Sequence, residues 1–207
     1  MKNLLLFIVI FLFSTFQASA QQNFDYEVLI EPVNISGVVG LQSYAFGQSD
    51  GKWLIIGGRR DGLHARQPVN AFPANNNNTT LYVIDPVSLE LWSASLLSLP
   101  QSIAEQLQST NMNFFQDADT LYIIGGYAYA ASATDHITFD KLTTVNVPAV
   151  IQAVIQNQSF TSFFKQTSNA IFANTGGQLG KIDDTFYLVG GHRIDGRYNP
   201  MNNPTFT

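Results

Sequence analysis

Three stretches carry four apolar, β-prone residues directly into a pair of glycines: Trp53-Leu54-Ile55-Ile56-Gly57-Gly58, Leu121-Tyr122-Ile123-Ile124-Gly125-Gly126 and Phe186-Tyr187-Leu188-Val189-Gly190-Gly191. The pairs recur at spacings of 68 and 65 residues (125 − 57 and 190 − 125). Self-similarity at a nearly regular spacing indicates that the chain is built from structural repeats.

Each glycine pair stands at the end of a predicted β-hairpin. The residues before it read as a strand, a tight turn and a return strand, with the turns at Asp50-Gly51, Asp119-Thr120 and Asp184-Thr185. Asp-Gly between apolar residues is among the strongest short-range hairpin signals. We expect each return strand to finish at its glycines, where the backbone turns with positive φ or packs closely.

Two further strands are expected after each of the first two hairpins. In the first repeat they are residues 81–84, closed by an Asp85-Pro86 turn, and residues 89–92; in the second they are residues 136–140 and 143–147. Four short antiparallel strands per repeat are typical of one blade of a β-propeller. The sequence thus predicts an all-β fold with about three four-stranded blades.

The repeats are longer than a compact propeller blade of roughly 40–50 residues. Residues 100–107 place Ile103 and Leu107 on one helical face, and residues 148–155 begin with a proline and repeat this apolar spacing. These patterns predict short helices in the connections between blades, with a disordered surface insertion as the alternative. Because a propeller ring typically has about four to eight blades, we expect the three blades to be a partial ring, the N-terminal part of a longer protein.

Composition supports a large core and excludes a basic surface for nucleic acid. Of 207 residues, 45% are hydrophobic and 12% are charged, and the net charge is −5. Nucleic acid is therefore not an expected partner. The chain has no cysteine, so its stability does not depend on disulfides, as fits a bacterial envelope or secreted protein with a substantial core.

Residues 1–20 have the pattern of a signal peptide. Lys2 precedes an apolar run over residues 4–13, and Ala18-Ser19-Ala20 provides a small-residue cleavage site. The apolar run is much shorter than the roughly 20 residues that span a bilayer. We expect cleavage after Ala20, no membrane span in the mature chain, and a secreted or periplasmic location. A lead-in strand is expected over residues 21–39 and the blades over residues 40–207.

With its glycine pairs and the stretch L-Y-V-I-D-P-V-S-L-E-L-W over residues 81–92, the sequence resembles the kelch repeats of β-propeller proteins. The resemblance covers about residues 40–198. It implies that the glycine pairs end the second strand of each blade, while Tyr82 and Trp92 belong to the third and fourth strands. Trp92 has no counterpart in the second repeat, where Val145 falls nearest. Exported kelch-like proteins of bacteria are similar in repeat length and in carrying a signal peptide.

The loops after the glycine pairs are the candidate binding sites, because the resemblance implies that they lie on one face of the propeller. They hold five of the ten basic residues and two of the three histidines. The candidate residues are Arg59, Arg60, His64, Arg66, Tyr127, Tyr129, His192, Arg193, Arg197 and Tyr198. Arginine suits carboxylates, phosphates or sulfated sugars, and tyrosine stacks on sugars or peptides. Alternatively, Arg and Asp of each loop pair with one another to hold the turn, and the tyrosines cover the blade below.

The first functional hypothesis is an exported binding module whose loops contact a protein or a glycan. The alternative is a carbohydrate-active enzyme similar to a sugar-acid mutarotase, in which arginines hold a carboxylate while a carboxylate or histidine moves protons. The three histidines lie in different repeats and no two have the spacing of metal ligands. No P-loop, G-x-S-x-G or H-E-x-x-H motif is present. The sequence therefore predicts no catalytic residue, metal or cofactor.

Overall fold

The computed structural model describes residues 26–63, 65 and 67–200. The predicted signal peptide lies outside these residues. The chain divides into two units, residues 1–34 and residues 35–207. Residues 26–39 contain no helix or strand, so the lead-in strand expected over residues 21–39 is wrong for its described part. A strand requires a partner for its backbone groups, and this segment has none in a β-ladder of the described chain.

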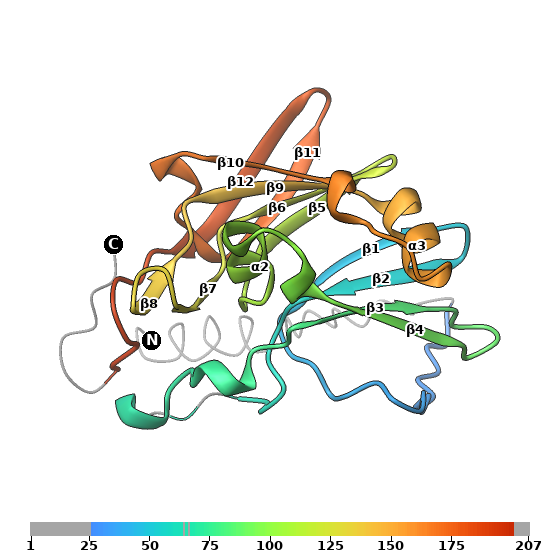
Figure 1. The fold of residues 1–207 in the computed structure, drawn as a ribbon, viewed down its shortest axis with the longest axis horizontal. Coiled ribbons are helices and arrows are strands. Elements are labelled where there is room, and N and C mark those ends of the chain that lie inside the picture. Colours follow the sequence, from blue (N-terminus) through green and yellow to red (C-terminus); the bar gives the residue numbers. More distant parts are fainter. Residues whose placement is uncertain (1–25, 64, 66, 201–207) are drawn as a thin grey trace, which may run out of the picture. The chain divides into compact units, whose positions relative to one another are not determined.

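The first sheet is a four-stranded antiparallel meander in chain order (Figure 1). It contains β1 (Ala45–Ser49), β2 (Lys52–Ile56), β3 (Thr80–Ile84) and β4 (Leu91–Ser95). Asp50 and Gly51 form the first turn with φ of 48° and 73°, and positive φ at both central residues is the pattern that Asp-Gly favours. The hairpin and the third strand are confirmed, whereas the fourth strand begins two residues later than expected.

The second sheet is also antiparallel and four-stranded, in the order β5-β6-β9-β10. Its strands are β5 (Asn113–Asp117), β6 (Thr120–Ile124), β9 (Lys141–Asn146) and β10 (Phe164–Ser168). The third strand expected over residues 136–140 is wrong, because β8 (Asp135–Thr138) pairs with β7 (Tyr127–Ala130) in a separate hairpin. Residues 143–147, expected as the fourth strand, belong largely to the third. Trp53 and Leu121 each stand four residues before their glycine pair, and they pair with Ile84 and Val145 respectively. Val145 is therefore equivalent to Ile84 of the third strand and is not the counterpart of Trp92 in the fourth.

Two short α-helices lie in the connections. Helix α2 (Gln101–Leu107) links the first sheet to the second, as predicted. Helix α3 (Val147–Ile155) instead joins the third and fourth strands of the second sheet, so its predicted place between blades is wrong. It begins one residue before the predicted start at residue 148. The Asn146 side chain accepts a hydrogen bond from Ala149 N at 3.0 Å and so caps the helix directly after β9. Short 3-10 helices occupy Pro68–Asn70, Ala74–Asn76, Leu96–Ser98, Thr161–Phe163 and Ala170–Phe172.

The third repeat contributes a long hairpin, β11 (Thr175–Ile182) and β12 (Thr185–His192). The second and third hairpins turn at residues 118–119 and 183–184, one residue earlier than predicted, because Thr120 and Thr185 already begin the return strands. Strand β12 runs through its glycine pair to His192, whereas β2 and β6 end directly before theirs.

The first and second sheets pack face to face. Leu54 and Leu81 of the first sheet share a core with Leu121 and Ile123 of the second. Helices α2 and α3 contribute to the same core. On the far side of the second sheet, Tyr122 contacts Phe186 of β12 at a ring distance of 4.6 Å. Strand β5 accordingly contacts both β1 and β11, the first strands of the neighbouring repeats.

Candidate binding site

The glycines after β2 and β6 start the candidate loops in the same way. Gly57 and Gly125 have φ of 71° and 67°, in the left-handed region that favours glycine. A Cβ on Gly57 would lie 2.3 Å from Leu107 O, and one on Gly125 would lie 1.8 Å from Asn174 O. Glycine thus allows the chain both to turn and to touch the segment that leads into the next repeat.

In the first two pairs, the second glycine adds a main-chain hydrogen bond to that segment. Gly58 N donates to Ser109 O at 2.9 Å, and Gly126 N donates to Asn174 O at 3.1 Å. We call this contact the glycine latch. It fixes the start of each loop relative to the following repeat.

Arg59, the first residue of the first loop, is buried rather than presented to solvent. Its side chain is 3% exposed and pairs through Nε and Nη2 with the carboxylate of Asp61, which also accepts from Asn76 Nδ2 at 2.9 Å. The guanidinium carbon lies 4.9 Å from the ring centre of Phe72. Burial acts to raise the pKa of Asp61, but the hydrogen bonds from Arg59 and Asn76 and the charge of Arg59 outweigh it and lower the pKa. Arg59 Nη1 is buried without a hydrogen-bond partner among the described residues.

An aromatic cluster joins the loops of all three repeats. The Phe72 ring meets Tyr127 at 5.0 Å and Tyr198 at 5.6 Å, both edge to face. Tyr127 Oη donates to Gly196 O and accepts from Tyr198 N, each at 2.8 Å. His136 Nε2 lies 2.8 Å from Phe72 O, and since a carbonyl only accepts, Nε2 carries the proton.

Burial shifts both titratable members of this cluster toward their neutral forms. It raises the pKa of Tyr127 and lowers the pKa of His136. Neither residue is thereby adapted to carry charge at neutral pH.

The loop of the third repeat is attached to the other two. Thr138 Oγ1 of β8 donates to Ile194 O at 2.9 Å and accepts from Ile194 N at 2.8 Å. Arg197 Nη1 donates to Val69 O in the first loop at 3.2 Å. Three segments far apart in sequence therefore form one continuous surface, which we call the loop face.

Arg-Asp pairing within loops is present in two repeats. Arg193 Nε donates to Asp195 Oδ1 at 2.9 Å, just as Arg59 pairs with Asp61 in the first loop. Each aspartate is followed by a glycine with positive φ, 67° and 75° respectively. These arginines therefore help to hold their turns, whatever else they contact.

A cavity of about 150 Å³ opens within the loop face. Its walls combine aromatic rings, an aliphatic side chain and polar groups. They are Phe72, Asn111, Tyr127, Thr175, Gly176, His192, Ile194 and Tyr198. Because both apolar faces and hydrogen-bonding groups meet there, the cavity suits a small amphipathic group such as a sugar ring or an amino-acid side chain.

Most of the predicted residues lie on this surface. Arg59, Tyr127, His192, Arg193, Arg197 and Tyr198 line the cavity or brace its loops. Arg60 is exposed and its Nη2 donates to Asn75 O at 2.6 Å, while Tyr129 meets the His136 ring at 5.4 Å. His64 and Arg66 lie outside the described residues.

The central residues that sequence reasoning missed are Phe72 and His136. Phe72 stands in a polar, asparagine-rich segment and is 4% exposed, with φ of 51°. An isolated aromatic residue in such a loop is the signal that could have identified it. His136 was expected in the third strand of the second sheet, and only the pairing of β8 with β7 brings it to Phe72.

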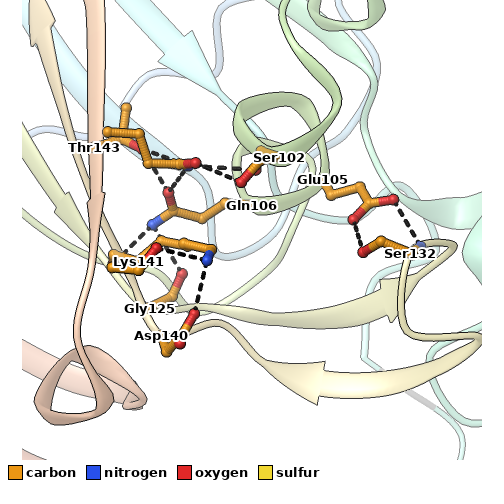
Figure 2. A network of polar contacts seen from close by, with 10 residues as sticks. Ser102, Glu105, Gln106, Gly125, Ser132, Asp140, Lys141 and Thr143 are labelled. Carbon is orange, nitrogen blue, oxygen red and sulfur yellow. Dashed lines mark hydrogen bonds and ion pairs between the residues drawn. The ribbon is translucent and has the colours of Figure 1, made fainter.

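A second, larger cavity of about 470 Å³ lies beside helix α2. Figure 2 shows the polar network around it. Glu105 Oε1 accepts from Ser132 N at 3.0 Å and from Gln101 Nε2 at 2.9 Å, while Glu105 Oε2 accepts from Ser132 Oγ. Burial acts to raise the pKa of Glu105, but these hydrogen bonds outweigh it and lower the pKa.

Gln106, the next residue of α2, is the buried centre of a separate set of polar contacts (Figure 2). Its Nε2 donates to the carbonyls of Gly125 and Lys141, at 3.3 and 3.1 Å, and its Oε1 accepts from Thr143 Oγ1 at 2.6 Å. Lys141 Nζ pairs with Asp140 at 3.1 Å. Because these polar groups satisfy one another, the network ties helix α2 to the second sheet, and we assign it a structural role.

Comparison with known proteins finds no protein-family model that matches this chain and no curated protein similar to it in sequence. Among the described residues, no group of three or more His, Asp or Glu side chains is placed to hold a metal ion. The described helices include none long and apolar enough to cross a membrane.

Proposed function

We propose that this chain is part of an exported kelch-type β-propeller that binds a protein or glycan ligand through its loop face. The single observation that carries the proposal is the convergence of the post-glycine segments of three repeats on one cavity of about 150 Å³. Loops held on a rigid β-scaffold are a common location for binding sites.

The propeller part of the proposal rests on the contacts between the first strands of successive repeats. Gln116 on β5 accepts from Gln48 N at 2.7 Å and donates to Gln48 O at 2.8 Å across to β1. On the other side, Asp117 of β5 pairs with Lys181 of β11 at 2.5 Å. First strands side by side are expected where blades surround a common axis.

Recognition would combine the cavity with two arginines that adjoin its lining residues in sequence, since Arg193 lies between His192 and Ile194 and Arg197 precedes Tyr198. Arg193 and Arg197 are exposed, and guanidinium groups bind carboxylates, phosphates and sulfates through paired hydrogen bonds. An acidic glycan or an acidic peptide with an aromatic or aliphatic side chain matches both features. We propose a secreted or periplasmic location on the sequence pattern of residues 1–20.

The test is binding of the full chain to an array of neutral and acidic glycans and to an acidic peptide library. The test variant carries His192→Ala and Arg193→Ala, two exposed residues at the loop face. The matched control is Lys165→Ala, an exposed cation on β10. We expect the double variant to lose at least about tenfold in affinity, or roughly 1.4 kcal/mol, with the control unchanged. Equal binding by all three folded proteins would refute the proposal.

A further inference from the structure

The hairpin β7–β8 has two faces, and the aromatic cluster of the loop face uses one of them. Tyr127, Tyr129 and His136 lie on that face, where the His136 ring contacts both tyrosines. Because alternate residues of a strand face opposite sides, Ala128 and its pairing partner Ile137 lie on the other face. Ile137 forms part of the wall of the larger cavity of about 470 Å³ beside α2. This cavity is therefore separated from the aromatic cluster by the hairpin.

The cavity has the size of a small-molecule site and walls of two kinds. Its volume lies within the range of roughly 300–1,000 Å³ that is typical of such sites. The apolar wall consists of Ile137 and Phe139, and Phe139 is 3% exposed. The polar walls are Gln101, Ser102, Glu105, Ser132, Asp140 and Lys141. An occupant that fits both kinds of wall has an apolar body and a polar end.

Glu105 brings a negative charge to this cavity without a cation beside it. The residue is 6% exposed, and the groups of Ser132 and Gln101 that donate to it are neutral. These hydrogen bonds outweigh burial and lower the pKa of Glu105, so the carboxylate is charged at neutral pH. None of the ion pairs among the described residues includes Glu105. Because buried charges are ordinarily paired, this carboxylate is suited to an added cation.

Lys141, the cation in the cavity wall, is already paired with other groups. Its Nζ lies 3.1 Å from Asp140 Oδ1 and donates to Ser168 Oγ at 2.7 Å. Figure 2 shows the two pairs apart, with Glu105 directed at Ser132 and Lys141 at Asp140. The charges of Asp140 and Lys141 cancel, so the cavity walls keep the single negative charge of Glu105.

Glu105 also retains an acceptor position for a ligand. Its Oε1 accepts from both Ser132 N and Gln101 Nε2, whereas its Oε2 accepts only from Ser132 Oγ. A carboxylate has about four acceptor positions, two on each oxygen. Oε2 can therefore accept one more hydrogen bond from a donor in the cavity.

We propose that the cavity beside α2 binds a small amphipathic amine, whose ammonium group donates to Glu105 Oε2 and whose apolar body packs against Ile137 and Phe139. The ammonium group supplies the positive charge that Glu105 lacks, and a hydrogen bond between two charged groups is stronger than one between neutral groups. A neutral alcohol of the same shape would leave the carboxylate without a counter-charge. This site is separate from the loop face, so the inference does not depend on what the loop face binds.

The probe is phenethylammonium, and phenethyl alcohol is its uncharged counterpart of nearly equal size. Each is titrated into the full chain by calorimetry, and amide NMR spectra follow Ser132, whose N–H donates to Glu105 Oε1 at 3.0 Å. We expect saturable binding of the ammonium probe and a shift of the Ser132 amide resonance on binding. The alcohol should bind at least about tenfold more weakly, because it cannot compensate the buried charge.

Glu105→Gln is the test variant, because an amide keeps the shape of the side chain and its contacts with Ser132 but carries no charge. Glu90→Gln is the matched control, since Glu90 also accepts from a serine hydroxyl, Ser88 Oγ at 3.2 Å, but is exposed. Glu105→Gln should weaken binding of the ammonium probe at least about tenfold, and Glu90→Gln should leave it unchanged.

The comparison of the two probes on the unaltered chain decides the matter even if Glu105→Gln does not fold. Absence of saturable binding by the ammonium probe would overturn the proposal, as would equal binding of the alcohol. Resonance shifts confined to the loop face would also overturn it, because they would place the probe on the other side of the hairpin. Unchanged binding by a folded Glu105→Gln variant would have the same consequence.

Discussion

Gly125, the residue before the latch glycine Gly126, needs to be glycine for two reasons, its positive φ and its close approach to Asn174, and replacement by alanine tests both. The substitution places a side chain in left-handed backbone, which costs about 1–2 kcal/mol. It also places Cβ 1.8 Å from Asn174 O, a main-chain atom that moves only with its segment. Overpacking of this kind costs about a further 1–3 kcal/mol, so Gly125→Ala should lose about 2–5 kcal/mol of the free energy of unfolding.

Gly190→Ala is the matched control, because its φ of 71° is similar and no atom lies within 4 Å of the added Cβ. It should lose only about 1–2 kcal/mol. Both variants are compared by urea unfolding followed by circular dichroism, using the midpoint and the slope of the transition. Equal losses in the two variants would refute the argument that close approach to the next repeat matters.

Three other substitutions test the interior. Gln106→Met should cost about 1–3 kcal/mol in urea unfolding because buried carbonyls lose their donor, and a neutral result would contradict its role in the network. Tyr127→Phe should cost about 1 kcal/mol and speed amide exchange at Tyr198, whose N–H loses its acceptor; unchanged exchange would argue against the contact. Since burial lowers the pKa of His136 below its ordinary 6.5, the unfolded chain binds this proton more readily. The stability that depends on neutral His136 should therefore be complete above about pH 6.5 and decline as the pH falls. His136→Gln should flatten that decline between pH 7.5 and 5.5, and an unaltered slope would contradict the assignment.

Local sequence signals predicted the hairpins well. Asp50-Gly51 and the apolar runs before the glycines identify strand, turn and strand from neighbouring residues alone. The β-rich composition and the antiparallel four-stranded sheets follow from the same signals. Hairpins are predictable because their partners are adjacent in the chain.

The pairing of strands that are far apart in the sequence was not predictable in the same way. Residues 136–140 have an acceptable strand pattern, but alternation does not say which strand they join, and β8 pairs with β7 instead of β6. Helix α3 has the expected apolar spacing, yet only the cap at Asn146 places it directly after the third strand. The candidate site was predicted in its loops but not in its centre, because Phe72 contacts residues more than 50 positions away.

The glycine latches join main-chain atoms to main-chain atoms, and this has a consequence for how the protein can change. A contact that uses no side chain is indifferent to the identity of the residues around it, apart from the glycines themselves. Exposed positions of these loops can therefore accept new residues, and with them new specificities, while neighbouring repeats stay coupled. The contacts between repeats can thus be kept while the residues that determine binding change.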